Sequence, residues 1–136
     1  MQSITWTKDL TVDVEVLDDD QKKVFAMIDE LQEAIMAGHD RGTLEAVLDR
    51  LMAYTRFHFA REEEFFAQTG YSAAAAHKRQ HDAMVKWVRN VQARFKDGSV
   101  AMLSLELRSF LQSWWITHIQ GSDKKYGPCL NAKGIH

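Results

Sequence analysis

Apolar residues recur at helical spacing in four stretches of the chain. The stretches cover about residues 18–37, 43–69, 72–96 and 99–120, and glycines separate them. In the first stretch, for example, Val24, Ile28 and Leu31 fall on one helix face. Each stretch opens on a residue whose side-chain oxygen can cap a helix: Asp18, Thr43, Ser72 and Ser99. The pattern therefore predicts four helices.

The connections between these stretches are only a few residues long, so neighbouring helices are expected to pack antiparallel. We predict an all-α fold, an antiparallel up-down-up-down four-helix bundle in one domain over residues 1–136. Residues 1–17 alternate weakly between apolar and polar positions and are expected to form an extended arm on the bundle. Residues 121–136 are expected to form a C-terminal tail.

The composition supports a globular domain and excludes several classes of function. Hydrophobic residues make up 46% and charged residues 26% of the chain, which is typical of globular proteins. The net charge of -2 gives no basic excess for binding nucleic acid or an anionic membrane. The single cysteine cannot form an internal disulfide, and no apolar run approaches the roughly 20 residues that span a bilayer. We expect a cytoplasmic protein without a nucleic-acid or membrane partner; a protein partner is left open.

Polar residues interrupt the apolar faces of the second and third predicted helices. His58 and Glu62 are four residues apart, and so are His77 and His81. Residues at i and i+4 lie one above the other on a helix. Each pair is therefore expected to point together into the core.

The fourth predicted helix contributes two further polar residues. Its apolar stripe continues to His118, and Asp123 follows five positions later. A spacing of five does not suit a straight α-helix. It requires the helix to end or to bulge near Gly121, and such bulges often lie at functional sites.

A metal ion best explains this set of residues. A lone inward histidine is usually a hydrogen-bonded core residue, but here four histidines accompany two carboxylates. Burying Glu62 and Asp123 unpaired would cost several kcal/mol each, and no Lys or Arg falls on these inward positions. Ligands of nitrogen and oxygen without thiolate argue against iron–sulfur clusters and cysteine-type zinc. Six ligands suit two carboxylate-bridged metals, and the absence of any Glu-x-x-His pair excludes the ferritin-like pattern.

The order of these motifs resembles that of the hemerythrin family, and within it the single-domain bacterial form. The motifs are His58-x-x-x-Glu62, His77-x-x-x-His81 and His118-x-x-x-x-Asp123. The resemblance covers nearly the whole chain. It also includes Trp6, Val12, Asp18 and the run Asp123-Lys-Lys-Tyr-Gly.

The resemblance implies two non-haem iron ions joined by an oxo or hydroxo bridge, with dioxygen bound at the second iron. One iron would be held by His77, His81 and His118, and the second by His58. Glu62 and Asp123 would bridge the two ions. The residues that match the oxygen pocket of the family are Trp114, Trp115 and Ile119.

One position departs from the family pattern. The family has a histidine near the start of the first helix as a further ligand of the second iron, and this chain has Gln21 there. Its spacing from Val24, Phe25 and Ile28 indicates that it faces inward. A glutamine amide is a neutral and weaker donor than imidazole, so we expect a second iron that is bound weakly or is lost.

The sequence leaves several functions open. The leading interpretation is a di-iron protein that binds dioxygen reversibly, as a carrier, a store or a sensor domain. The alternative is a di-iron enzyme that processes peroxide or nitric oxide, which the altered ligand favours. A metal store or a zinc-bound bundle without redox chemistry comes third. A pure scaffold is least favoured, because its inward carboxylates would lack partners.

Overall fold

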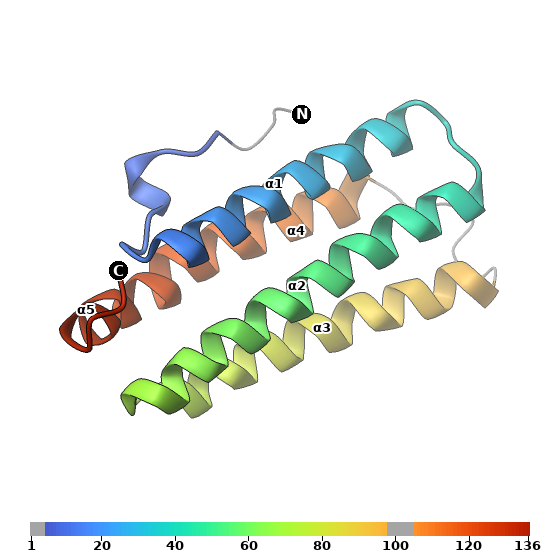
Figure 1. The fold of residues 1–136 in the computed structure, drawn as a ribbon. Helices are drawn as coiled ribbons and strands as arrows, with labels where there is room; N and C mark the ends of the chain where they lie inside the picture. Colours follow the sequence, from blue (N-terminus) through green and yellow to red (C-terminus); the bar gives the residue numbers. More distant parts are fainter. Residues whose placement is uncertain (1–4, 98–104) are drawn as a thin grey trace.

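The computed structural model describes residues 5–97 and 105–136. Four long helices form the bundle, which confirms the predicted fold class: α1 (Glu15–Met36), α2 (Arg41–Thr69), α3 (Ala74–Asp97) and α4 (Leu105–His118). A π-helix (Ile119–Asp123) joins α4 to α5 (Lys124–Ala132), and a short 3₁₀-helix (Lys8–Leu10) lies in the N-terminal arm. Figure 1 shows α1 beside α4 and α2 beside α3, with α1 also packed on α2.

A continuous apolar core runs through the bundle. Its fully buried members come from several elements and include Leu17, Ile28, Leu51, Leu111 and Trp115. At one end of the bundle, the start of α1, the end of α2 and the helix α5 lie together (Figure 1). Because neighbouring helices run in opposite directions, the late part of α2, the early part of α3 and the end of α4 reach the same level. This level is where the polar core residues lie.

The first two helices begin earlier than the sequence predicted, and Asp18 and Thr43 are not their N-caps. Helix α1 begins at Glu15, so Asp18 lies inside its first turn. The Asp18 carboxylate accepts hydrogen bonds from the Thr11 hydroxyl at 2.5 Å and the Val12 backbone N–H at 2.9 Å. It therefore ties the arm to the helix. At α2 the cap is Asp40, which accepts from the Thr43 backbone N–H at 2.8 Å.

Most of the segment predicted as a C-terminal tail, residues 121–136, is helical. The helix continues through the π-helical turn into α5. Helix α3 begins at Ala74, two residues after the predicted cap Ser72. The predicted start of the fourth helix at Ser99 lies outside the described residues.

The N-terminal arm packs on α5 and on α1. Val12 and Val14 are buried. The backbone of the arm passes so close to α5 that a Cβ atom on Gly127 would lie 2.6 Å from the Val12 carbonyl oxygen. A glycine is required there because any side chain would push the arm away.

Among the described residues, no helix has both the length and the apolar composition of a membrane-spanning segment.

Candidate metal centre

The π-helical turn brings His118 and Asp123 to the same side of the chain. A π-helix places residues five apart above one another, whereas an α-helix does so for residues four apart. The His118 Nε2 atom consequently lies 2.9 Å from the Asp123 Oδ1 atom. Of the two arrangements that the five-residue spacing allowed, a helix end or a bulge, the structure has the bulge.

Three histidines form one half of the centre, which we call the three-histidine half: His77 and His81 from α3 and His118 from the end of α4. The His118 Nε2 atom lies 3.1 Å from that of His77 and 3.2 Å from that of His81. All three side chains are almost completely buried. Their Nε2 atoms therefore converge on one point in the core.

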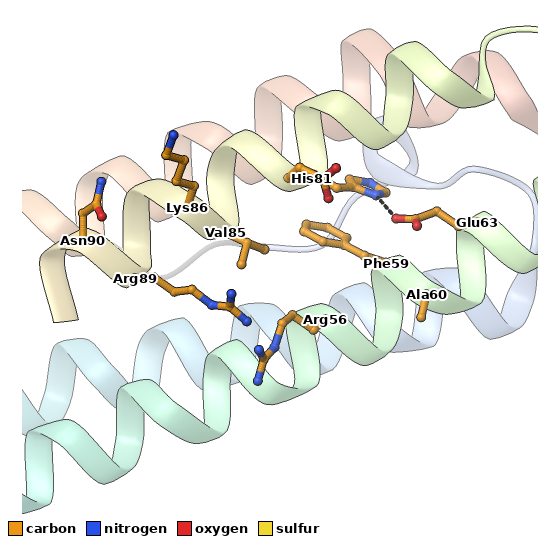
Figure 2. A pocket seen from close by; sticks show the side chains of 10 residues that line it. Arg56, Phe59, Ala60, Glu63, His81, Val85, Lys86, Arg89 and Asn90 are labelled. Atoms are coloured by element: carbon orange, nitrogen blue, oxygen red, sulfur yellow. Dashed lines mark hydrogen bonds and ion pairs between the residues drawn. The ribbon is translucent and has the colours of Figure 1, made fainter. Parts of the chain in front are cut away.

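Two of these rings are oriented by partners on their outer side. The His81 Nδ1 atom lies 2.9 Å from Glu63 Oε2, the contact drawn as a dashed line in Figure 2. The His118 Nδ1 atom lies 2.8 Å from Gln80 Oε1. When Nδ1 carries the proton and donates it outward, Nε2 presents its lone pair inward, as in metal-ligating histidines.

The two buried carboxylates each keep one oxygen open toward the three-histidine half. Glu62 Oε1 and Asp123 Oδ1 accept no hydrogen bond from any residue that the structure describes. Glu62 Oε1 lies 3.2 Å from His81 Nε2, and Asp123 Oδ1 lies 3.0 Å from His77 Nε2. One ligand atom from each of the five residues falls within 4.8 Å of all the others. Lone pairs this close repel one another unless a cation lies between them, so these residues fit a metal ion.

The charges in the metal-free centre show the same need for a cation. Burial would raise the pKa of Glu62, but the adjacent imidazoles hold it well below the usual range. Burial would lower the pKa of His77, but the carboxylates of Asp123 and Glu62 outweigh this effect and raise it to about 9. A proton on His77 therefore takes the place of the metal cation at neutral pH. Metal binding has to displace that proton.

Gln21 and His58 form the other half of the centre, which we call the glutamine half. Gln21 is completely buried on α1. Its amide nitrogen donates to Asp123 Oδ2 at 2.6 Å and lies 3.4 Å from His58 Nε2. One amide group thus contacts two atoms that would otherwise face a second metal. Its own oxygen, Oε1, has no hydrogen-bond partner among the described residues.

His58 is oriented by Asp20, a buried carboxylate next to Gln21 on α1. The His58 Nδ1 atom lies 3.1 Å from Asp20 Oδ2. Asp20 also accepts from the Tyr54 hydroxyl at 3.0 Å and from Arg61 at 3.1 Å. Burial would raise the pKa of Asp20, but His58, Tyr54 and Arg61 together lower it. This network fixes the ring with its Nε2 atom toward the centre.

Aromatic rings enclose the centre. Phe59 stacks on His81 with ring centroids 3.7 Å apart, and Trp114 stacks on His118 at 4.4 Å. Trp115 is completely buried and lies 5.8 Å from the His58 ring. Ile119, the third residue predicted for the oxygen pocket, is also completely buried. Phe59 and Trp114 thus cover the His81 and His118 rings, and Trp115 lies against His58.

The structure brings all six predicted ligands and Gln21 together, and it adds four residues that the sequence analysis missed. Asp20, Glu63 and Gln80 contact the ligand histidines, and Tyr126 donates to Glu62 Oε2 at 2.5 Å. Asp18 was predicted as a helix cap, but of the three aspartates at 18–20 it is Asp20 that is buried. Tyr126 could have been expected near the centre, because it follows Asp123 by three residues and so lies on the same helix face.

Buried cations are present in the bundle but do not neutralise the two central carboxylates. Arg108 is completely buried on α4 and lies 3.5 Å from Asp29 on α1. Arg61 pairs with Asp20. Within residues 5–97 and 105–136, no Lys or Arg pairs with Glu62 or Asp123.

The four-helix bundle and the histidine and carboxylate residues in its core place this chain in the class of non-haem metalloproteins. Comparison with known proteins narrows the class. Residues 12–130 match the family described as Hemerythrin HHE cation binding domain. The bacteriohemerythrin of Methylococcus capsulatus (strain ATCC 33009 / NCIMB 11132 / Bath) is 35% identical over 133 residues, which cover 97% of this chain and 100% of that protein. The bacteriohemerythrin of Stenotrophomonas maltophilia (strain R551-3) is 34% identical over 132 residues, covering 97% of this chain and 84% of that protein.

Solved structures agree with the sequence relatives. A crystal structure of wild-type hemerythrin superposes with a TM-score of 0.89 at 33% sequence identity, covering 95% of this chain and 98% of that chain. The chain therefore belongs to the hemerythrin family. It is a non-haem iron protein of the oxygen-binding kind.

Proposed function

We propose that this protein binds dioxygen reversibly at two iron ions of unequal affinity, and that it acts as a carrier, a store or a sensor domain. The observation that carries the proposal is the asymmetry of the centre. The open lone pairs of five residues converge on the three-histidine half. In the glutamine half, the Gln21 amide already donates to Asp123 Oδ2 and lies next to His58 Nε2.

The first iron would be held by His77, His81 and His118, with Glu62 and Asp123 as the shared carboxylates. His58 would be the histidine of the second iron. Ferrous iron supplies the electrons on which dioxygen binding depends. The protein's own part is to orient the imidazoles from outside and to keep the space around them dry.

The Gln21 amide opposes the second iron. Its N–H groups face Asp123 Oδ2 and His58 Nε2, so a metal ion must compete with hydrogen bonds that are already made. Turning the amide by half a turn would exchange its nitrogen and oxygen and present Oε1 as a ligand. That ligand is neutral and weaker than imidazole, so the second iron is expected to bind more weakly than the first.

The experiment is to load the protein with Fe(II) without oxygen, to remove unbound metal, and to measure iron per chain. The same measurement on Gln21→His shows whether the missing imidazole restores the second ion. We expect the variant to retain more iron than the wild type and to release it more slowly to a chelator. His39→Ala is the matched control, because His39 is exposed in the loop between α1 and α2.

The outcomes separate the possibilities. About two irons per wild-type chain, with reversible changes in the visible spectrum on adding and removing dioxygen, would support the proposal. About one iron per chain, without such changes, would rule out ordinary oxygen carriage. If Gln21→His and the wild type lost iron at equal rates, Gln21 would not be the cause of any weakness.

One observation favours a second candidate, an enzyme that processes peroxide or nitric oxide. The second metal position lacks an imidazole at Gln21, so one side of it is left for an exogenous ligand. The test is oxidation of a reducing substrate by hydrogen peroxide with many turnovers per chain. Activity that His77→Ala abolishes would support the enzyme, and binding in a fixed ratio without turnover would contradict it.

A further inference from the structure

A groove between α2 and α3 opens beside the metal centre and has no role in the proposed function. It encloses about 500 Å³. The side chains at its two ends differ in charge (Figure 2). His81 and Glu63 lie at one end, and Arg56, Lys86 and Arg89 lie toward the other. We propose that this α2–α3 groove binds a small aromatic phosphate.

Three cationic side chains in the groove lack a counterion. Arg56 comes from α2, and Lys86 and Arg89 come from α3. None of them forms an ion pair with any residue that the structure describes. In Figure 2 the two guanidinium groups point toward one another from facing helices. Like charges converging without an anion are unfavourable, so this end of the groove is suited to an anionic group.

The acidic side chains of the groove do not provide that anion, because each already has a partner. Glu63 contacts His81 at 2.9 Å. Asp82 forms an ion pair with Lys78 at 2.8 Å. The groove is lined by three cationic side chains (Arg56, Lys86 and Arg89) and two acidic ones (Glu63 and Asp82), so positive charge is in excess.

The region between the charged ends is apolar. Phe59, Ala60 and Val85 line it, and the Phe59 ring stacks on His81 beneath. A second cavity of about 310 Å³ shares Arg56, Val85 and Arg89 with the groove. Asp49 also lines this cavity, and its carboxylate accepts from the Gln92 amide at 2.7 Å. Concave sites of about 300–1,000 Å³ are typical of small-molecule binding. The groove therefore suits a flat apolar ring more than the surface of a protein.

The chemistry of the anionic group follows from the two arginines. A guanidinium makes paired hydrogen bonds to phosphate with matching geometry, and two guanidiniums together complement a dianion better than a single carboxylate. A ring attached to the phosphate would lie over Val85 toward Phe59. It would then lie next to Phe59, whose ring stacks on the candidate ligand His81.

The proposal is tested on the metal-free protein, so its result does not depend on iron or dioxygen. The probe is flavin mononucleotide, and riboflavin serves as the matched compound without the phosphate. Titration followed by flavin fluorescence should give saturable binding of flavin mononucleotide, at least about tenfold tighter than riboflavin. Adenosine monophosphate, followed by calorimetry, tests whether other aromatic phosphates bind.

Two substitutions locate the site. Arg56→Gln and Arg89→Gln remove one guanidinium each from exposed positions, so the variants should fold like the wild type, which circular dichroism checks. Each should weaken flavin mononucleotide binding by about tenfold. Arg79→Gln is the control, because Arg79 is exposed on α3 outside the groove.

Three results would overturn the proposal. The first is no saturable binding of flavin mononucleotide or adenosine monophosphate up to about 1 mM. The second is equal binding of riboflavin and its phosphate. The third is binding that neither arginine substitution changes, which would place the ligand elsewhere on the chain.

Discussion

The two halves of the metal centre solve the problem of buried polar groups in different ways. In the three-histidine half, His77, His81 and His118 point their Nε2 atoms at each other and at open carboxylate oxygens. In the glutamine half, the Gln21 amide donates to Asp123 and faces His58. The first half requires a cation, whereas the second is largely satisfied by a neutral side chain.

A buried histidine that is oriented like a ligand does not by itself show that its surroundings need a metal. His58 is as deeply buried and as well oriented as the other histidines. Its half of the centre nevertheless gains less from a metal, because a hydrogen-bond donor is already close to its ligand atom. The predictions below test whether the two halves behave as differently as their contacts indicate.

The largest effect is expected from His77→Ala. This change removes a nitrogen ligand from the half that most needs a cation and leaves Asp123 Oδ1 with one close imidazole fewer. Iron affinity of the first site should fall by at least about 100-fold, measured by competition with a chelator. The control is His39→Ala. Wild-type iron retention in His77→Ala would show that the three-histidine half is not the main site.

A smaller and more selective effect is expected from Asp20→Asn. The change keeps the shape but removes the negative charge that orients the His58 ring through Nδ1. Substitution of such outer partners typically costs about 10–100-fold in metal affinity. Here the loss should fall on the second iron only. Asp19→Asn, at an exposed neighbouring position, is the control, and an equal loss of both ions would contradict the division into halves.

The metal-free protein should lose stability as the pH rises. The pKa of His77 is raised from 6.5 in the unfolded chain to about 9 in the fold, and that of His58 is also raised. Their stabilising contribution is therefore complete below about pH 6.5 and is lost as the pH rises through the folded pKa. Urea unfolding should show a decrease on the order of 2 kcal/mol in the free energy of unfolding up to about pH 9. His77→Ala should flatten this dependence; an unchanged slope would assign it to other groups.

The smallest effect is expected from Gln80→Ala. Gln80 accepts from His118 Nδ1 at 2.8 Å, as Asp20 does from His58, but Gln80 is exposed. Water can replace its oxygen at little cost. Iron affinity should change by less than about threefold in the chelator competition. A loss as large as that in Asp20→Asn would mean that the burial of the outer partner does not matter.

Much of the centre could be predicted because its residues follow local helical geometry. The pairs His58/Glu62 and His77/His81 share a helix face whatever surrounds them, since four residues make about one turn. The five-residue spacing from His118 to Asp123 likewise required a helix end or a bulge, and a π-helix is present there. These features depend on the backbone of a single segment.

The helix ends and the outer partners could not be predicted in the same way. Any of the aspartates at 18–20 suits a helix start. Which of them is buried depends on where α2 presents His58, Tyr54 and Arg61. Asp18 instead binds the arm at Thr11 and Val12, a contact between segments that local pattern does not encode. The extension of the chain into α5 was missed for a related reason, because α5 is held by packing against the arm at Gly127.

By itself, the sequence determined the helical bundle, the inward direction of the six candidate ligands and the departure at Gln21, because the 3.6-residue period links position to direction. Only the tertiary structure decided what Gln21 does there. Its amide contacts Asp123 and His58, residues 102 and 37 positions away along the chain. A hydrogen bond between distant segments depends on how the helices pack, and no single-segment pattern contains that information.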